Sequence, residues 1–148
     1  MRRQEFESDK GLEIADASLY GVLSMVDPQG MAYGVPLNFW RQGDRLYFHC
    51  ARTGRKIDCL RANPHVSICF VREARVIPEA MTTRYASAIV TGTARELTDT
   101  EEKRQAAVAL CRRYQVPEER IARGFHGCLP AVAIWEITPD SVTGKERL

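Results

Sequence analysis

One segment in the middle of the chain constrains the fold more than any other: a strand, a basic loop and a short helix follow one another between residues 45 and 64. Apolar residues on alternate positions from 45 to 51 predict a strand, because successive strand side chains point to opposite faces. The inward face carries Leu46, Phe48 and Cys50. Tyr47 and His49 then point to the other face, which we expect to be exposed.

The loop that follows this strand has the composition of an anion site. Ile57 and Leu60 lie one helical turn apart, and Asn63-Pro64 ends the helix because proline disfavours the helical conformation in the residue before it. The loop therefore lies at a helix N-terminus, where free backbone N–H groups favour an anion. Its charges, hydroxyl and glycine come from Arg52, Thr53, Gly54, Arg55 and Lys56. We interpret it as a phosphate site; a solvated basic turn is the alternative, since the spacing of a nucleotide P-loop is absent.

Length and composition exclude several classes of protein. The chain has 148 residues, of which 45% are hydrophobic and 27% charged, which predicts one domain over residues 1–148. The formal net charge of +2 argues against nucleic acid as a partner. No apolar run approaches the roughly 20 residues of a membrane helix, and no apolar segment follows the polar start. We therefore expect a cytoplasmic protein with neither a signal peptide nor a membrane partner.

The five cysteines predict no metal site. Their spacing is irregular and contains no Cys-x-x-Cys, which argues against a zinc ribbon or a redox pair. His49 and Cys50 are neighbours in a strand and point to opposite faces, so they do not form a shared ligand pair. We expect free thiols in a reducing compartment at Cys50, Cys59, Cys69, Cys111 and Cys128.

Upstream of the central segment, short turns separate runs of strand-like sequence. We expect a helical segment within residues 1–17, mainly 4–17, then a strand at 20–26, a turn at Asp27-Pro28-Gln29-Gly30 and a strand at 31–40. The faces of this last strand carry Val35, Leu37 and Phe39 on one side and Pro36, Asn38 and Trp40 on the other. Together with the strand at 45–51 they predict an antiparallel meander.

Pro36 restricts where the 31–40 strand can lie. Proline cannot donate a ladder hydrogen bond, so it implies a sheet edge or a bulge. A bulge beside Asn38 would leave backbone groups free to bind a ligand. An ordinary edge proline is an equally good interpretation of the same residue.

The second half of the chain alternates strands with irregular segments. Strands are expected at 65–71, 84–95 and 131–137, with a mobile loop at 72–83. Gly92 lies inside a long strand and predicts a bulge or a barrel bend. Long strands in a meander, about six in all, predict a mainly β fold: a six-stranded antiparallel barrel with flanking helices. An open antiparallel sheet is the alternative.

One long helix is well signalled. Thr98-Asp99-Thr100-Glu101 matches a capping box, and Arg112-Arg113 suit the helix end. Its buried stripe should consist of Ala106, Ala107 and Leu110. A short helical turn is expected up to Ala122, and then a loop at 124–130 whose His126 is solvated or lies at a cleft rim. Thr138-Pro139-Asp140 should end the last strand, which leaves Thr143-Gly144-Lys145 in a tail.

Four stretches carry a family resemblance: Tyr33-Gly34-Val35-Pro36-Leu37-Asn38-Phe39, Leu46-Tyr47-Phe48-His49-Cys50-Ala51, Gly54-Arg55-Lys56-Ile57-Asp58 and Leu60-Arg61-Ala62-Asn63-Pro64-His65-Val66. Together they resemble the FMN-binding split barrel of the pyridoxamine 5′-phosphate oxidase-like superfamily. They are most similar to its branch of 5-nitroimidazole-resistance (Nim-type) proteins, which Tyr85-Ala86-Ser87, Gly92 and Thr143-Gly144-Lys145 also fit. The resemblance extends over about residues 18 to 145.

The resemblance implies an assembly and a cofactor. The split barrel pairs as a homodimer, and two FMN molecules lie in clefts between the subunits. For the phosphate it implies Arg55 and Lys56, with Cys50, Ala51 and Gly54 close by; for the isoalloxazine ring, Val35, Pro36, Leu37, Asn38 and His49; and for either part, Ser87. Cys50 stands where another small residue is expected.

The activity implied is a flavin-dependent oxidation and reduction. A reduced pyridine nucleotide or another donor would supply electrons, and a small planar acceptor such as a nitroaromatic would receive them. His49 is the catalytic candidate, because histidine can donate a proton. Residues 142–148 do not match the substrate-binding arginines and histidines of true pyridoxamine-phosphate oxidases, which argues against that substrate. The alternatives are a non-catalytic module that holds flavin, haem or a deazaflavin, and a structural dimer without cofactor.

Overall fold

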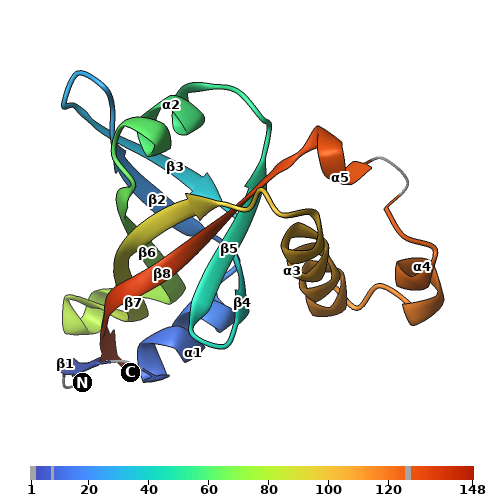
Figure 1. The fold of residues 1–148 in the computed structure, drawn as a ribbon. Coiled ribbons are helices and arrows are strands. Elements are labelled where there is room, and N and C mark those ends of the chain that lie inside the picture. The colour runs from blue at the N-terminus through green and yellow to red at the C-terminus, as the bar shows by residue number, and fades with distance from the viewer. Residues whose placement is uncertain (1–2, 8, 126–127) are drawn as a thin grey trace.

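The computed structural model describes residues 3–7, 9–125 and 128–148 (Figure 1). Within them the chain forms eight strands, five α-helices and one short 3-10 helix. The elements in chain order are β1 (Arg3–Glu7), α1 (Asp9–Ala17), β2 (Gly21–Val26), β3 (Ala32–Leu37), β4 (Trp40–Gln42), β5 (Arg45–Cys50), α2 (Arg55–Ala62), β6 (His65–Ile77), η1 (Pro78–Ala80), β7 (Thr82–Glu96), α3 (Thr100–Arg113), α4 (Glu118–Ala122), α5 (Cys128–Ala131) and β8 (Ala133–Arg147).

The strands form one antiparallel sheet that curls on itself. Their order is β3-β2-β6-β7-β8-β5-β4, and β1 pairs with β8 off this path. The two ends of the order, β3 and β4, are joined by residues 38–39 alone. Because so short a connection spans at most about 11 Å, the sheet curls until its ends meet. The predicted mainly β split barrel with flanking helices is confirmed, with eight strands in the described residues in place of six.

Aromatic packing inside the barrel fixes the end of β3. Phe39 lies edge-on to Phe48 and Phe70, with ring centroids 5.7 and 5.4 Å apart, and all three are buried. Phe39 follows Asn38 directly, so this contact anchors the exposed edge formed by β3. The residues expected on the inward face of the 31–40 strand therefore do face the core, although a break before Trp40 divides that strand into β3 and β4.

Helices cover the outside of the barrel. α3 packs over β5 and β8 on a second apolar cluster, and α3, α4 and α5 gather on one side of the barrel (Figure 1). The residues of that cluster are Trp40, Tyr47, Leu97, Ala106, Ala107 and Ile134. The predicted stripe is thus confirmed at Ala106 and Ala107, with Leu110 half-buried beside it. In the described part of the chain, no helix is both long enough and apolar enough to cross a membrane.

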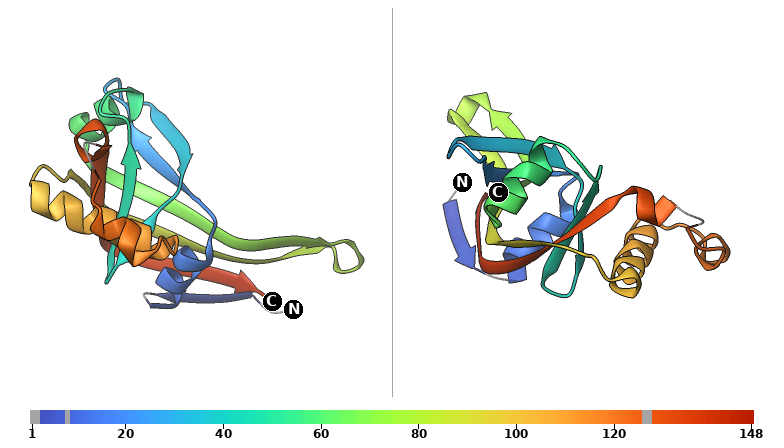
Figure 2. Two further views of the ribbon diagram at one scale, coloured as in Figure 1. Left: turned by 90° about the vertical axis from the view of Figure 1, so that its right-hand side faces the viewer. Right: turned by 45° about the horizontal axis from the view of Figure 1, so that its top comes forward.

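Residues 72–83, expected as a mobile loop, belong to a long hairpin. β6 and β7 stay paired as far as Ile77 and Thr82, and Pro78 begins the 3-10 helix at the tip. Figure 2 shows this hairpin projecting from the barrel. The prediction was wrong because residues 71–76 are exposed throughout, so no alternation of apolar and polar side chains marks the strand.

Pro139 does not end the last strand. β8 continues to Arg147, and Pro139 lies opposite Gly92 where the register between β7 and β8 shifts. A side chain at Gly92 would overlap the carbonyl oxygen of Thr138, so glycine is required for this close approach. The predicted irregularity at Gly92 is confirmed, while the predicted strand end at 138–140 and the tail at 143–145 are wrong.

The two helix starts that the sequence marked differ in detail from expectation. The segment 4–17 is not one helix, because Arg3–Glu7 pairs with the end of β8 before α1 begins. The cap of α3 is Asp99, one residue later than expected, and its carboxylate accepts the N–H of Glu102 at 2.9 Å. A short helix interrupts the loop expected at 124–130, because residues 128–131 form α5. His126 and the side chain of Cys128 lie outside the described residues.

Candidate functional site

The basic loop leaves the start of α2 open. Gly54 is the N-cap residue with a φ of 139°, and no side chain caps the helix. A Cβ at Gly54 would meet no atom within 4 Å, so the space beside this residue is open. Ile57, Cys59 and Leu60 are buried and hold α2 on the barrel core. The predicted helix N-terminus is confirmed, and its geometry can accept an anion.

Two of the three cations in the loop turn away from one another. The Nη1 atom of Arg52 donates to the carbonyl oxygen of Pro130 in α5, 3.0 Å away. Arg55 faces the β2–β3 hairpin instead: its guanidinium carbon lies 4.0 Å from the centroid of the Tyr33 ring, and its Nη2 lies 3.7 Å from Oδ2 of Asp27. The loop therefore contacts both the hairpin and α5, and its charges do not converge on one point.

Lys56 is the third cation of the loop, and its ammonium group remains available to bind an anion. It is half-buried, and in the described part of the chain it has neither an ion pair nor a side-chain hydrogen bond. Burial raises the pKa of the Cys50 thiol, and the charge of Lys56 offsets part of that rise. Cys50 is thus a neutral thiol at the end of β5, and Lys56 carries the free charge beside it.

The β3 edge of the sheet lies on the side of the basic loop that contacts the β2–β3 hairpin. β3 ends the strand order, and its exposed Pro36 needs no ladder partner there. No register shift interrupts the pairing of β2 with β3, so the edge interpretation holds and the bulge beside Asn38 is absent. Val35 and Leu37 are half-buried against the core, while Asn38 is exposed and its Nδ2 donates to the carbonyl of Leu19 at 2.8 Å.

His49 lies on the opposite face of β5 from Cys50, beside α3. It is exposed, and its ring centroid lies 6.1 Å from that of Trp40. With α3 and α5 it lines an apolar groove of about 140 Å³. The groove is formed by His49, Ala107, Leu110, Cys111, Phe125, Leu129, Val132 and Ile134. Within one chain, the structure therefore places His49 in the groove beside α3 and α5, away from the candidate residues on the β3 edge.

Ser87 lies on the outer surface of the sheet. It pairs with Val71 on β6 and with Lys145 on β8, and Ser87 and Lys145 each lie between two buried neighbours. β2 and β6 separate its strand from β3. The candidate residues thus fall into three places: the open start of α2 with the β3 edge, the groove at His49, and the outer sheet face at Ser87.

Tyr47 is not part of an exposed cleft, contrary to expectation. It is 7% exposed under α3, and its hydroxyl donates to Oε2 of Glu136 at 3.0 Å. Burial, followed by this hydrogen bond, raises the pKa of Tyr47 to about 12. The expectation failed because the outer face of β5 is covered by a helix that lies 50 residues away in sequence.

Glu136 is the residue that sequence reasoning missed. Its side chain is 4% exposed, and Arg45 and Arg95 bind its Oε1 at 3.1 and 3.0 Å. Burial alone would raise its pKa, but the hydrogen bonds from Arg95 and Tyr47 outweigh burial and lower it. A single acid inside the apolar run 133–137 was the available signal, because a buried carboxylate needs partners.

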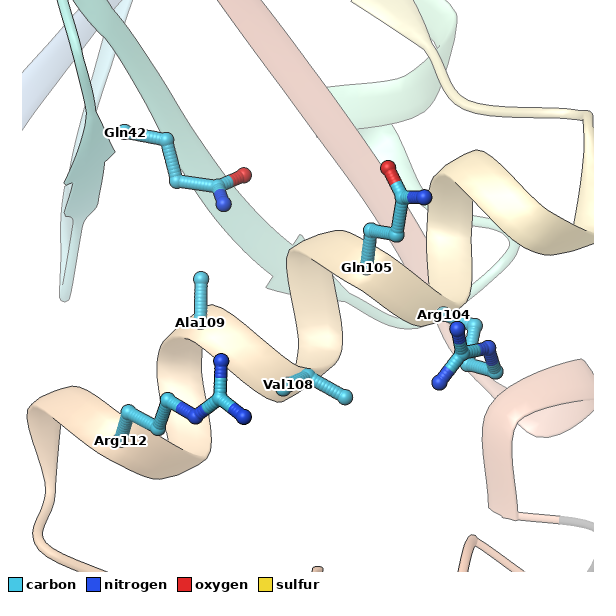
Figure 3. Close-up of a pocket in the computed structure, with 6 residues that line it drawn as sticks. All are labelled: Gln42, Arg104, Gln105, Val108, Ala109 and Arg112. Atoms are coloured by element: carbon cyan, nitrogen blue, oxygen red, sulfur yellow. The ribbon is translucent and has the colours of Figure 1, made fainter.

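A hollow on the far side of α3 carries none of these groups. It has a volume of about 490 Å³ and lies between α3 and the β4–β5 turn (Figure 3). Its lining consists of Gln42, Arg104, Gln105, Val108, Ala109 and Arg112. No group of three or more His, Cys, Asp or Glu side chains within the described ranges is arranged to hold a metal ion.

Comparison with known families agrees with the barrel fold. The family model of pyridoxamine 5′-phosphate oxidase matches residues 7–146. The chain belongs to the pyridoxamine 5′-phosphate oxidase family. A search of curated proteins gave no match.

Solved structures of similar fold include flavoproteins. A candidate 5-nitroimidazole antibiotic resistance protein from Bacteroides thetaiotaomicron is 25% identical, over 98% of this chain and 89% of that one, with a TM-score of 0.80. A flavocytochrome from Azotobacter vinelandii is 19% identical over 97% and 69%, with a TM-score of 0.82. An FAD-binding protein from Mesorhizobium loti is 23% identical over 100% of both chains, with a TM-score of 0.73. At these identities the last two show the fold alone.

Replacing Glu136 with Gln should lower the free energy of unfolding by about 1.5–3 kcal/mol near pH 7, the range for hydrogen bonds to a charged group. Folding lowers the pKa of Glu136. Its contribution is therefore present above the ordinary Glu value of about 4.3 and is lost as the pH falls through the lower folded value. Urea unfolding near pH 7 and near pH 3.5 should show a gap between wild type and variant that narrows in acid.

The matched control for this experiment is Glu101→Gln, whose exposed carboxylate pairs with Arg104 on α3. Exposed pairs contribute little, so this variant should unfold like the wild type. A Glu136→Gln gap of equal size at both pH values would contradict the assignment.

Proposed function

We propose that this protein is an FMN-dependent oxidoreductase that reduces a small planar acceptor such as a nitroaromatic. The observation that carries the proposal is the open start of α2 at Gly54, beside Lys56, which has no side-chain partner among the residues that the structure describes. Family membership and the flavin-binding proteins of similar fold support the choice of cofactor. The likeness to a candidate nitroimidazole-resistance protein supports the choice of acceptor.

The residues present fit an FMN phosphate. Free N–H groups of α2, the Lys56 ammonium and the Thr53 hydroxyl suit a dianion, and Gly54 leaves room for its close approach. Arg55 acts by holding the loop against the hairpin, through Tyr33 and Asp27. Cys50 and Ala51 would border the same space.

The edge strand would hold the ring system. Backbone groups on the open side of β3, at Val35, Pro36, Leu37 and Asn38, would border the isoalloxazine, because an edge strand leaves alternate N–H and C=O groups unpaired. When bound, FMN supplies the transfer of electrons from a reduced pyridine nucleotide to the acceptor. The chain's own contribution is to orient the ring, exclude water and place a proton donor, for which His49 is the candidate.

We further propose that the protein works as a homodimer. One row of outward side chains crosses five strands in register and is uncovered: Pro36, Val22, Cys69, Ile89 and Thr143. Pro36 on the proposed cofactor edge lies in this row, and Ser87 lies two residues from Ile89 on the same face. A second subunit on this face would bury the row and could bring its own residues to the cofactor.

Light scattering at micromolar concentration should give twice the 16.7 kDa of one chain. Ile89→Lys places a charge in the middle of the row and should yield monomers. Tyr114→Lys, at the exposed end of α3, should leave the mass unchanged. A wild-type protein with the mass of a single chain would refute the dimer.

Lys56→Ala should weaken FMN binding by about 10- to 150-fold, which corresponds to the loss of a charged hydrogen bond of about 1.5–3 kcal/mol. The fold should persist, because Lys56 is only half-buried. Quenching of FMN fluorescence on titration with protein gives the dissociation constant. Arg61→Ala, on the same helix but paired with Glu96, is the control and should bind FMN normally. Equal affinity of wild type and Lys56→Ala would refute the phosphate assignment.

His49→Ala should retain its melting temperature and most of its flavin, but lose turnover of a nitroaromatic acceptor by about 100-fold or more, the scale of general acid catalysis. Flavin absorbance, thermal melting and steady-state rate are measured on one preparation. His65→Ala, an exposed histidine at the start of β6, is the matched control. Normal turnover would remove the catalytic role, and collapse into unfolded monomers would instead indicate a structural histidine at the dimer interface.

A second candidate function is a binding module that holds flavin, haem or a deazaflavin without turnover. The structural likeness to a flavocytochrome supports this second function. The visible absorption spectrum of the purified protein separates flavin from haem. A flavin-loaded protein that is not reduced by a pyridine nucleotide and does not reduce a nitroaromatic would favour this second function.

A further inference from the structure

A second hollow lies on the α5 side of the basic loop, away from the residues assigned to flavin. Its volume is about 280 Å³, and it is bounded by Arg52, the β7–α3 connection, α3 and α5. The lining residues are Arg52, Glu96, Leu97, Thr98, Thr100, Lys103, Leu129, Pro130, Val132 and Ala133. Among them are two cations, two hydroxyls and one carboxylate, so the hollow has the donors of an anion site.

The two cations in this hollow are held in place by neutral groups. Arg52 donates to the carbonyl of Pro130 at 3.0 Å, and Nζ of Lys103 donates to the carbonyl of Val132 at 2.5 Å. A carbonyl oxygen orients a cation but does not cancel its charge. Burial, and then repulsion from Arg52, lowers the pKa of Lys103, and the charge of Glu96 offsets part of that fall.

The single acid in the lining does not balance this charge. The Oε1 of Glu96 lies 3.6 Å from Arg61 on α2, so its charge is shared with a third cation. The hydroxyls of Thr98 and Thr100 add donors at the same wall. The hollow thus has a net positive charge, and its two cations are already held in place on its wall, which favours the binding of an oxyanion.

This hollow adjoins the groove at His49, because Leu129 and Val132 line both. The groove is lined by apolar side chains apart from His49 and has a volume of about 140 Å³, close to the roughly 150 Å³ of an apolar cavity that admits benzene. The two adjoining hollows therefore offer a space for a single ring, a histidine and a pair of cations.

We propose that the acceptor is a single-ring aromatic that carries an oxyanion: the ring lies in the His49 groove, and the carboxylate or phosphate lies between Arg52 and Lys103. This inference rests on the proposed function and narrows its substrate class. Lys103 is a specificity-determining residue in this proposal, because a neutral acceptor gains nothing from it.

The test is equilibrium binding to the purified, flavin-loaded protein, measured by isothermal titration calorimetry without any reductant. The probes are 4-nitrobenzoate, its neutral methyl ester, and 4-nitrophenyl phosphate. Lys103→Gln and Arg52→Gln are compared with Arg104→Gln, which removes the same charge one residue further along α3, where Arg104 pairs with Glu101. Lys103→Arg restores the charge, and thermal melting verifies that each variant is folded.

Wild type should bind 4-nitrobenzoate about 10-fold more tightly than the ester, as expected for one charge-assisted hydrogen bond. Lys103→Gln and Arg52→Gln should each remove most of that preference, while Lys103→Arg and Arg104→Gln keep it. Tighter binding of the phosphate than of the carboxylate would identify a phosphorylated ligand. Equal affinity of wild type for acid and ester, or an equal loss in Arg104→Gln, would overturn the proposal.

Failure here is distinct from failure of the proposed function. A protein that reduces the ester as well as the acid, and binds both equally, keeps the oxidoreductase activity and loses the oxyanion site. A protein that never turns over, yet prefers 4-nitrobenzoate in a Lys103-dependent way, keeps the oxyanion site and loses the oxidoreductase activity.

Discussion

The buried carboxylate of Glu136 holds the barrel and the helical side of the molecule together. Arg45 on β5, Arg95 on β7 and the Tyr47 hydroxyl all bind it, and Arg95 also bonds Glu102 on α3. A buried charge without partners would cost several kcal/mol, so these groups must be in place together. These bonds fix the position of α3 against β5 and β8. The position of α3 in turn forms the groove at His49 and places Lys103 near the basic loop.

β8 connects the Glu136 network to the rest of the barrel. Its first half is buried, and its second half is mostly exposed. Residues 133–137 are buried on both faces, between the core and α3, whereas beyond Ile137 only Gly144 and Glu146 are buried. The first half therefore reads as a continuous apolar run, interrupted only by Glu136, and the second half reads as a polar tail. One strand thus serves both the ionic network and the outer face proposed to pair with a second subunit.

Local sequence predicted the parts of the fold whose causes are local. The strand, loop and helix of residues 45–64 and the turn at 27–30 depend on proline, glycine and alternation within a few residues, and the structure has them as expected. The hairpin at 72–83 and the burial of Tyr47 depend on partners far along the chain, which periodicity does not contain. For the same reason, the sequence of residues 50–56 predicted that Cys50 and Lys56 lie near each other. It did not predict that His49 lies away from the β3 edge, or that Glu136 is a buried ionic centre.

The divergence of the three loop cations suggests how one short motif can serve two ligands. Arg55 contacts the β2–β3 hairpin and Arg52 contacts α5, which leaves Lys56 as the loop cation that has no side-chain partner within the described residues. In the proposed arrangement, a phosphate bound by Lys56 and backbone N–H groups would leave Arg52 to bind a second anion on the α5 side of the loop. Because the loop contacts both the hairpin and α5, an anion bound on one side would constrain the backbone that presents the cation on the other. Cofactor and acceptor sites would then be coupled through the four residues 51–54, with no movement of the barrel required.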